Sequence, residues 1–474
     1  MSGSILWFRR DLRLSDHRAL RAACETGPVY PLFIRDAAVD RLGAAPKWRL
    51  EAGLARLAGA LDAAGSRLIL RSGDALDVLQ ALIEETGAEA VHWHRLYDRQ
   101  ARARDERVKT TLTAYGIKAQ SHAGHLLFEP WQVQTAAGAG FKVFTPFWKA
   151  MRGRDPGTPL LRPPRIGAPD VWPESEALES WGLGRAMQRG AAIVARYEDP
   201  GEAAAQARLE AFTDGAMAGY GQSRDALGES EGSSGLSGYL SLGEVSARQV
   251  WAAAFGSEPG PESRRGARPG GEGFLRQLGW REFAWHLLFH SPDMPDTPWR
   301  PGWADFPWQE TSPAAQAWTR GQTGVDLVDA AMRELYVTGR MQNRARMVVA
   351  SYLTKHLMVD WRFGQRWFED CLTDWDVASN ALGWQWVAGC GPDAAPFFRI
   401  FNPERQAAKF DPDGRYRQRW LAEGQARPPA TALAFFEAVP KHWRLHPDMP
   451  RPAPAVTLRQ GRERALAAWR ATRG

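Results

Sequence analysis

The sequence contains little cysteine and no apolar run long enough to cross a membrane. Its 474 residues include three cysteines, Cys24, Cys371 and Cys390, whose spacing matches neither a CxxC pair nor a zinc site. So few thiols indicate a reducing compartment without a disulfide framework. At the N-terminus the charges follow a short apolar run, which is the wrong order for a secretory signal. We therefore expect a cytoplasmic protein with no membrane partner.

Several common catalytic signatures are also missing. The sequence has no HExxH, Walker A or EF-hand pattern, and we predict no metal site. No GxGxxG follows the first apolar run, so the sequence lacks the fingerprint of an NAD-binding fold. The GxSxG match at 228–232 lies in an acidic polar stretch and lacks the preceding apolar strand that a hydrolase nucleophile elbow requires.

Tryptophan and positive charge are abundant. Of the 22 tryptophans, fifteen lie at or after Trp251, so whatever requires indole rings is concentrated in the C-terminal half. A net charge of +6 and a pI of about 9.3 are compatible with a polyanionic partner. The chain is long enough for two or three domains, each with its own core.

The first 130 residues alternate strand and helix patterns. Apolar runs at 4–8, 29–34, 67–70, 90–93 and near 117 alternate with amphipathic stretches at 47–63, 74–85 and 98–115. Buried strands that alternate with helices predict an α/β domain over 1–130, a Rossmann-like doubly wound parallel sheet. Such sheets bind ligands beyond the carboxyl ends of their strands. We expect Ser15 or Asp16 to cap the helix that ends near Cys24.

The remainder of the chain lacks strand patterns. Residues 131–200 are rich in Gly, Ala, Pro and Arg, which predicts a long linker over the surface. From 201 to 474 the periodicity is helical, so we expect an all-α domain. The longer helices are predicted over 203–215, 246–255, 273–290, 324–338, 343–357 and 361–372.

The stretch 374–403 carries the most specific pattern. It contains Asp374, Asp376 and Asn380, followed by Trp384 and Trp386. Positions i and i+2 of a helix point to nearly opposite sides, so one indole can face the interior and the other a cavity. Two core aromatics would be the simpler interpretation. The DxDxxxNxxGWQW pattern, however, resembles the flavin-binding core of the photolyase/cryptochrome family. The segments WFRRDLR at 7–13 and TPFW at 145–148 resemble the same family.

This resemblance implies an N-terminal antenna domain and a C-terminal helical domain that holds a U-shaped FAD. The activity that it implies is light-driven repair of cyclobutane pyrimidine dimers by an electron from excited reduced FAD, with no net redox change. The implied partner is UV-damaged DNA, single- or double-stranded, with the dimer flipped out of the helix. A monomer is implied. The antenna would be 5,10-methenyltetrahydrofolate or a deazaflavin, and an empty antenna site stays open.

Two segments match the family's cofactor contacts. A Ser-rich loop before a helix suits a pyrophosphate through its N–H and O–H groups, although it could simply be a capping loop. Three arginines within 340–346 are usually a solvated face, yet GRMQNRARM resembles a flavin-binding motif in which Arg340 and Gln342 replace the usual Trp and His. A fixed cation near the flavin, balanced by Asp374, would stabilise its reduced anion. The resemblance assigns FAD binding to Tyr220, Ser233, Ser234, Leu236, Ser237, Arg281, Asn343, Arg346, Asp374, Asp376 and Asn380.

The family's tryptophan triad has counterparts here. Trp308, Trp361 and Trp384 occur at the triad's spacings within otherwise matching segments. The resemblance implies that they carry electrons from the surface to reduce the flavin in light. It also places Asn380 opposite flavin N5, where a neutral amide can both donate and accept a hydrogen bond.

The lesion pocket shows the main departure from the family. The resemblance assigns substrate binding to Gln277, Trp280, Asn343, Met347, Trp386 and Arg399, with the two indoles stacking on the flipped dimer. Dimer photolyases usually carry Glu at position 277, and Gln cannot supply a proton. A (6-4) photolyase carries Gln there, but also a His pair where this chain has Ala345 to Met347. We favour dimer repair, with (6-4) repair or a cryptochrome-like light sensor as alternatives. Asn380 argues against a plant-type sensor, which carries Asp there.

The C-terminal region is also basic. Its cations could contact phosphates around the lesion, although charge runs are usually solvated faces. They are Arg399, Arg405, Lys409, Arg415, Arg417 and Arg419.

Overall fold

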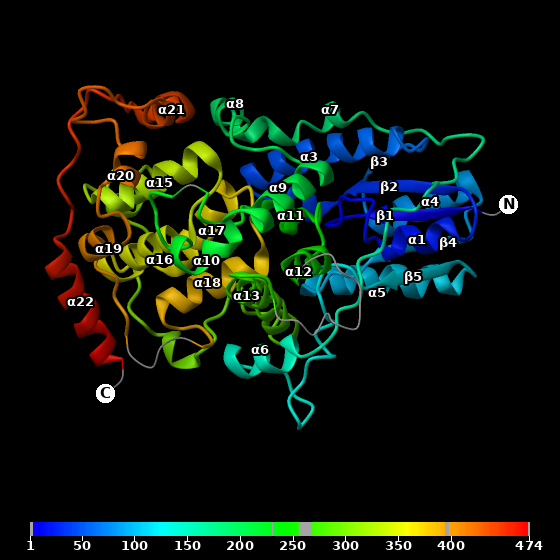
Figure 1. The fold of residues 1–474 in the computed structure, drawn as a ribbon, viewed down its shortest axis with the longest axis horizontal. Helices are drawn as coiled ribbons and strands as arrows, with labels where there is room; N and C mark the ends of the chain where they lie inside the picture. The colour runs from blue at the N-terminus through cyan, green and yellow to red at the C-terminus, as the bar shows by residue number, and fades with distance from the viewer. Residues whose placement is uncertain (1–2, 230, 256–266, 394–397, 473–474) are drawn as a thin grey trace.

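The structure is a computed structural model, and it describes residues 3–229, 231–255, 267–393 and 398–472. All strands lie at the N-terminal end, and helices make up the other end (Figure 1). None of the helices in the described ranges has the length and apolarity needed to span a bilayer.

The N-terminal sheet has five parallel strands in the order β3-β2-β1-β4-β5. Its strands are β1 (Ser4–Phe8), β2 (Val29–Arg35), β3 (Ile69–Ser72), β4 (Ala90–His94) and β5 (Lys118–His122). Strands β1, β2 and β4 are almost wholly buried, as expected for the inner strands of a parallel sheet. This topology confirms the predicted Rossmann-like sheet.

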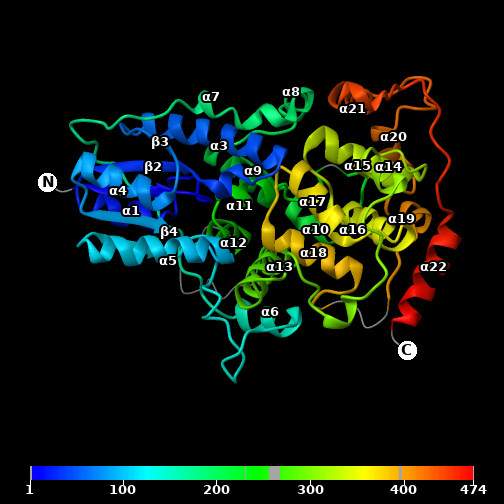
Figure 2. The same cartoon turned by 180° about the vertical axis from the view of Figure 1, so that it is seen from behind.

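Helices cover both faces of the sheet because side chains alternate along each strand. Leu6 and Phe8 of β1 pack in one cluster with α1 (Arg18–Cys24) and α3 (Ala44–Asp62). Ile5 and Trp7 face the opposite side and pack with α4 (Ala75–Thr86) and α5 (Arg99–Ala114). In Figures 1 and 2 the sheet lies between α3 and α5. A short α2 (Ala37–Asp40) follows β2.

The cap of α1 differs from the prediction. His17, not Ser15 or Asp16, is the N-cap, and its Nδ1 accepts the N–H of Leu20 at 3.0 Å. Asp16 has a φ of 45°, and its carboxylate is bonded to the helical domain instead. The prediction was therefore wrong because long-range contacts outweigh a local capping preference.

His17 also belongs to a buried cluster with Asp11 and His94. One Asp11 carboxylate oxygen lies 3.1 Å from His17 Nε2 and 2.9 Å from His94 Nδ1. These distances alone would fit a metal ion. Because His17 Nδ1 is an acceptor, its ring proton must lie on Nε2, which therefore faces Asp11 as a donor and not as a metal ligand. The cluster holds the end of β1 against α1 and β4.

Residues 131–200 contain four short helices and run beside the sheet. They are α6 (Phe144–Arg152), α7 (Leu178–Trp181), η1 (Leu183–Met187) and α8 (Arg189–Val194). Along the β3 edge, Leu70 donates its N–H to Ser175 Oγ and accepts the N–H of Glu176, both at 2.9 Å. The segment thus covers an edge strand that would otherwise expose unpaired groups.

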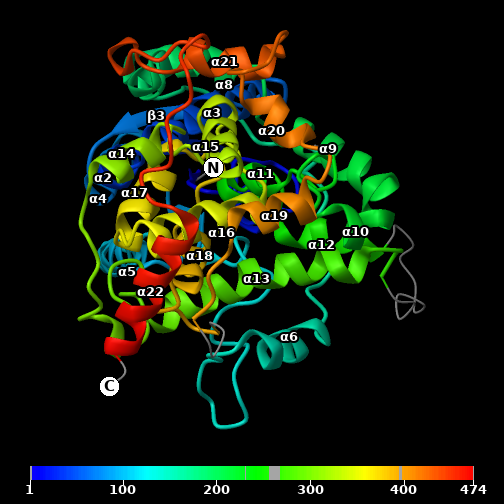
Figure 3. The same cartoon turned by 90° about the vertical axis from the view of Figure 1, so that its left-hand side faces the viewer.

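Every element named after residue 200 in the described ranges is a helix, which confirms the predicted all-α architecture. The expected helices are present, and the one predicted over 343–357 continues from α16 into a π-helical turn, η4. In order, the elements are α9 (Glu202–Asp214), η2 (Ala216–Gly219), α10 (Tyr220–Ser223), α11 (Ser237–Leu242), α12 (Ala247–Phe255), α13 (Gly271–His290), η3 (Pro301–Trp303), α14 (Pro313–Thr319), α15 (Asp326–Thr338), α16 (Asn343–Ser351), η4 (Tyr352–His356), α17 (Trp361–Cys371), α18 (Val377–Ala388), α19 (Pro403–Phe410), α20 (Arg415–Trp420), α21 (Ala430–Ala438), η5 (Lys441–Trp443) and α22 (Leu458–Ala471). Figure 3 shows α22 on the outside of this helical end.

A buried ion-pair network joins the two ends of the molecule. Arg49 on α3 is 1% exposed; its Nη1 lies 2.9 Å from Glu244, and its Nε lies 3.1 Å from Glu198. Burial raises the pKa of Glu244, and the Arg49 guanidinium opposes that rise. Burying such groups is costly, so the network fixes one orientation of the domains more than it adds stability.

Removing one partner of this network should destabilise the fold strongly. We expect Glu244→Ala to lower the free energy of unfolding by about 3–5 kcal/mol, because it leaves the buried Arg49 charge undercompensated. Urea unfolding followed by circular dichroism measures this loss. The matched control is Glu437→Ala, whose partner Arg196 lies 3.4 Å away with both side chains 57% exposed. That change should cost about 1 kcal/mol or less. Equal losses in the two variants would contradict the role given to the network.

Candidate functional site

Helix α16 presents three predicted site residues on one face. Asn343, Arg346 and Met347 stand at i, i+3 and i+4, which are neighbours on a helix surface. Arg346 Nη2 lies 2.7 Å from Asp374 Oδ2, and Arg346 Nε donates to the carbonyl of Met341 at 2.7 Å. The predicted pairing of Arg346 with Asp374 is therefore present.

The two departures from the family motif have structural roles. Gln342 is the N-cap of α16, and its Oε1 accepts the N–H groups of Arg344 and Ala345. Arg340 forms an ion pair with Glu198, whose carboxylate also accepts the hydroxyl of Thr373 at 2.9 Å. Both substitutions thus support the segments that carry Asn343 and Asp374.

Helix α18 carries the central pattern of the sequence. Asp376 caps the helix by accepting the N–H of Ser379, and it also accepts the indole N–H of Trp285 at 3.0 Å. Asn380 donates to the carbonyl of Gln365 at 3.1 Å. Trp384 is 2% exposed and Trp386 is half-buried, so the two indoles do point to different environments.

The Ser-rich loop is anchored by Arg208. This side chain donates to the carbonyls of Ser233 and Ser234, at 3.0 and 2.7 Å. The N-cap of α11, Leu236, has no side-chain bond to the first turn of the helix. Arg208 thus holds this loop through its carbonyl groups and not through its N–H and O–H donors. Tyr220 is mainly a core residue, packed edge-on against Phe212 and Phe274.

Arg281 points toward the N-terminal domain. Its Nη1 lies 3.0 Å from Glu282, and its Nη2 donates to the carbonyl of His125 at 3.1 Å. Burial raises the pKa of Glu282 to about 7. The carboxylate also accepts the N–H of Leu127. In this position Arg281 links α13 to the chain that leaves the sheet.

The three tryptophans predicted to form the relay lie on α18, at the start of α17 and beside that start. Trp384 packs against Gly364, where an added Cβ would lie only 2.1 Å from the indole. Trp361 begins the same helix one turn earlier. Trp308 is fixed beside it, because Gln309 accepts the N–H of Asp360 and donates to Met358, both at 2.8 Å. The indole N–H groups of Trp361 and Trp384 are buried without a partner.

The two indoles predicted to hold the lesion, Trp280 and Trp386, lie on α13 and α18. Trp280 on α13 stacks on Phe144 of α6, with centroids 3.8 Å apart and planes at 7°. Trp386 on α18 donates its N–H to the carbonyl of Asp393 at 3.1 Å, and the Arg399 guanidinium lies 5.8 Å from its ring centre. Gln277 lies one turn before Trp280 and is half-buried. No role was predicted for Phe144, which directly precedes the family-like segment 145–148.

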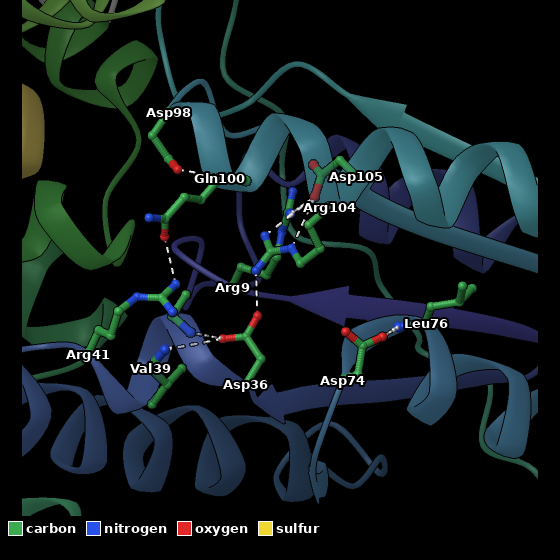
Figure 4. A network of polar contacts seen from close by, with 12 residues as sticks. Arg9, Asp36, Val39, Arg41, Asp74, Leu76, Asp98, Gln100, Arg104 and Asp105 are labelled. Carbon is green, nitrogen blue, oxygen red and sulfur yellow. Dashed lines mark hydrogen bonds and ion pairs between the residues drawn. The ribbon is translucent and has the colours of Figure 1, made fainter. Parts of the chain in front are cut away.

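A cleft of about 1290 Å³ between the domains was not predicted residue by residue. Its walls include Arg9, Asp36, Asp74 and Asp98, which follow the first four strands at their carboxyl ends. Figure 4 shows the polar contacts there. Arg104 Nη1 lies 2.6 Å from Asp36.

Arg41 also lines the cleft. Arg41 donates to the neutral side chain of Gln100 at 2.6 Å, as Figure 4 shows. Asn380 and Gln365 line the same cleft, so it extends from the sheet to α18.

Comparison with known proteins identifies the family. Residues 4–164 match the model described as DNA photolyase, and residues 274–471 match the FAD binding domain of DNA photolyase. A deoxyribodipyrimidine photo-lyase of Agrobacterium fabrum is 44% identical over 99% of this chain and 98% of its own. A deoxyribodipyrimidine photo-lyase from Synechococcus is 39% identical over 88% of this chain and 87% of its own.

A solved structure agrees with these relatives. A bacterial class III photolyase from Agrobacterium tumefaciens superposes with a TM-score of 0.91 at 43% identity, over 100% of this chain and 98% of that chain. Sequence and fold therefore agree over the whole length, and the chain belongs to the DNA photolyase family.

Proposed function

We propose that this protein is a light-driven DNA repair enzyme that splits cyclobutane pyrimidine dimers. A relative that is 44% identical over 99% of this chain is a deoxyribodipyrimidine photo-lyase, and so is one that is 39% identical over 88% of it. One observation carries the proposal for this chain's own residues. Eight of the residues assigned to the cofactor and to the lesion lie on α13, α16 and α18, and α18 packs against both of the other helices.

The residues present fit an FAD. Asp374 Oδ1 and Gln365 Oε1 are buried without a hydrogen-bond partner, beside Arg346 and Asn380 respectively. Buried acceptors without partners are rare in folded proteins, and here they suit the N–H and hydroxyl donors of a flavin and its ribityl chain. When bound, reduced FAD supplies the electron after it absorbs light. Arg346, Asp374 and Asn380 would hold the ring, and Ser233, Ser234 and Ser237 the phosphates.

The aromatic walls explain how a lesion would be held. A dimer inside a duplex cannot reach a buried group, so it must be extruded into a pocket. Stacking of a base on an aromatic ring contributes about 1–3 kcal/mol. Phe144 supports one face of Trp280 and so fixes its orientation. Gln277 would hydrogen-bond a thymine edge, which requires no charge.

The alternatives have less support. A (6-4) enzyme would require a His pair at 345–347, and this chain has Ala345, Arg346 and Met347. Asn380 differs from the Asp of plant sensors. The half-buried Trp280 and Trp386 favour a substrate pocket over a site that serves signalling alone.

The basic C-terminal residues are proposed to contact DNA phosphates, but they differ in availability. Arg417 is bonded to the buried Asp411 at 2.9 Å, so its role is structural. Arg415 lies 3.5 Å from Asp413. Arg399, which lies on Trp386, is the contact that we propose beside the lesion.

The test of this function is repair of a defined thymine dimer in single- and double-stranded oligonucleotides, in blue light and in darkness. We expect thymine to be restored only in light. Gln277→Glu should repair faster, because a carboxyl can donate a proton to the dimer radical and an amide cannot. Gln316→Glu on the exposed face of α14 is the matched control and should change nothing. Absence of repair by protein with bound, reduced FAD would contradict the proposal.

We further propose that the interdomain cleft binds the second chromophore, and that this is methenyltetrahydrofolate. The cleft lies at the carboxyl ends of parallel strands, where such sheets bind ligands. A folate carries glutamate carboxylates that a guanidinium binds well, and Arg41 is available for them. A deazaflavin core lacks this tail.

Chromophore extraction tests the assignment. Wild-type protein should release a folate on denaturation, and Arg41→Met should release several-fold less. The matched control is Arg56→Met on α3, since the Arg56 side chain is 63% exposed and does not line the cleft. A deazaflavin in the extract, or equal folate from both variants, would contradict the proposal.

A further inference from the structure

An aromatic cluster extends beyond Trp308, the outermost of the three relay tryptophans. Trp303 lies nearly parallel to Trp308, with centroids 6.2 Å apart and planes at 20°. Phe306 lies against both indoles, 4.9 Å from Trp303 and 4.3 Å from Trp308. The ring of Phe398 also contacts Trp303, with centroids 5.8 Å apart. Trp303 is therefore in ring contact with the end of the relay.

Trp303 lies where protein meets water. It ends the short turn η3, and residues 301, 302, 304 and 305 around it are exposed. The indole itself is half-buried. Its inner edge rests on Gly389, where an added Cβ would lie 3.2 Å from the ring. The Trp303 ring thus contacts Trp308 and is also partly exposed to solvent.

The inner and outer indoles differ in what they can do with a positive charge. Trp361 and Trp384 are buried, and their N–H groups have no acceptor. An oxidised indole there cannot lose its proton readily, and its charge is poorly solvated. An indole at the solvent boundary is solvated and can release its proton to water. A positive charge formed inside therefore moves outward.

Lys355 lies near the Trp303 ring. It is fully buried, with Nζ bonded to the carbonyl of Ala388, 5.4 Å from the Trp303 ring centre and 3.6 Å from that of Phe398. An ammonium this close would oppose a cation on Trp303. Burial lowers the pKa of Lys355 well below its usual value and so favours the uncharged amine. The uncharged amine does not oppose a cation on Trp303.

We propose that Trp303 is a fourth indole of the electron relay and its exit to solvent. Trp303 gives one electron to oxidised Trp308, which returns to its neutral closed-shell form. The Trp303 radical cation then releases its N–H proton to water, and an external thiol later returns one electron and one proton to the neutral radical. The proposal rests on the proposed function, because light-driven reduction of the flavin is what oxidises Trp308.

The experiment maps where the radical ends. Holoenzyme is illuminated with a nitroso spin trap and no added thiol, and peptide mass spectrometry locates the adduct. We expect the adduct on Trp303 in wild-type protein and none in darkness. Trp308→Phe should abolish the Trp303 adduct. Trp303→Phe should move the adduct to Trp308 and reduce several-fold the flavin that stays reduced after a flash.

Two controls separate the relay from simple exposure. Trp361→Phe interrupts the path upstream and should remove the adduct from both outer indoles. Trp469→Phe removes another indole of the same cluster, stacked on Phe398 at 5.6 Å, and should leave the Trp303 adduct unchanged. Melting curves monitored by circular dichroism would show that each variant is folded.

The outcomes distinguish this inference from the proposed function. An adduct on Trp308 alone, or a Trp303 adduct that persists in Trp308→Phe, would overturn the fourth indole while leaving photoreduction intact. No adduct on any indole, together with no photoreduction, would overturn the electron path as a whole. Equal adducts on Trp303 and the 43% exposed Trp131 would mean labelling by exposure and would also overturn the inference.

Discussion

Glu198 is a buried carboxylate on which both the domain arrangement and the site depend. It lies between Arg49 of the sheet domain and Arg340 of the helical domain, and it accepts the hydroxyl of Thr373. Arg340 precedes Asn343 by three residues, and Thr373 precedes Asp374 by one. One carboxylate thus fixes the entries to both flavin-side segments against the sheet domain. The side chains of Glu198 and Arg49 are each 1% exposed, so water cannot replace a lost partner of this pair.

Much of the architecture could be predicted from local patterns. Continuous apolar runs alternating with amphipathic stretches gave the parallel sheet, and helical periodicity gave α13, α15 and α17 within a few residues. The spacing of Trp384 and Trp386 predicted that the two indoles differ in environment, because a helix separates i from i+2. The pairing of Arg346 with Asp374 also followed from the motif, since both residues belong to segments that resemble one family.

What the sequence could not provide depends on contacts between distant segments. His17 caps α1 because Asp16 is held by the helical domain, which no local propensity contains. Phe144 supports Trp280 across 136 positions of chain, and Trp303 meets Trp308 through a 3₁₀ turn without a periodic pattern. The departures at Arg340 and Gln342 looked like weaknesses of the motif. Their partners, Glu198 and the first turn of α16, became visible only in three dimensions.

The measurement that tests the role of Glu198 most directly is a comparison of two melting curves in one variant. Glu198→Gln keeps the shape of the side chain but removes the charge that Arg49 and Arg340 share. Heating the FAD-loaded variant while recording flavin fluorescence and circular dichroism follows cofactor release and unfolding together. The account predicts that both midpoints fall by the same amount, because one group supports the domain interface and the flavin site. A fall in the unfolding midpoint alone, with FAD release unchanged from wild type, would contradict it.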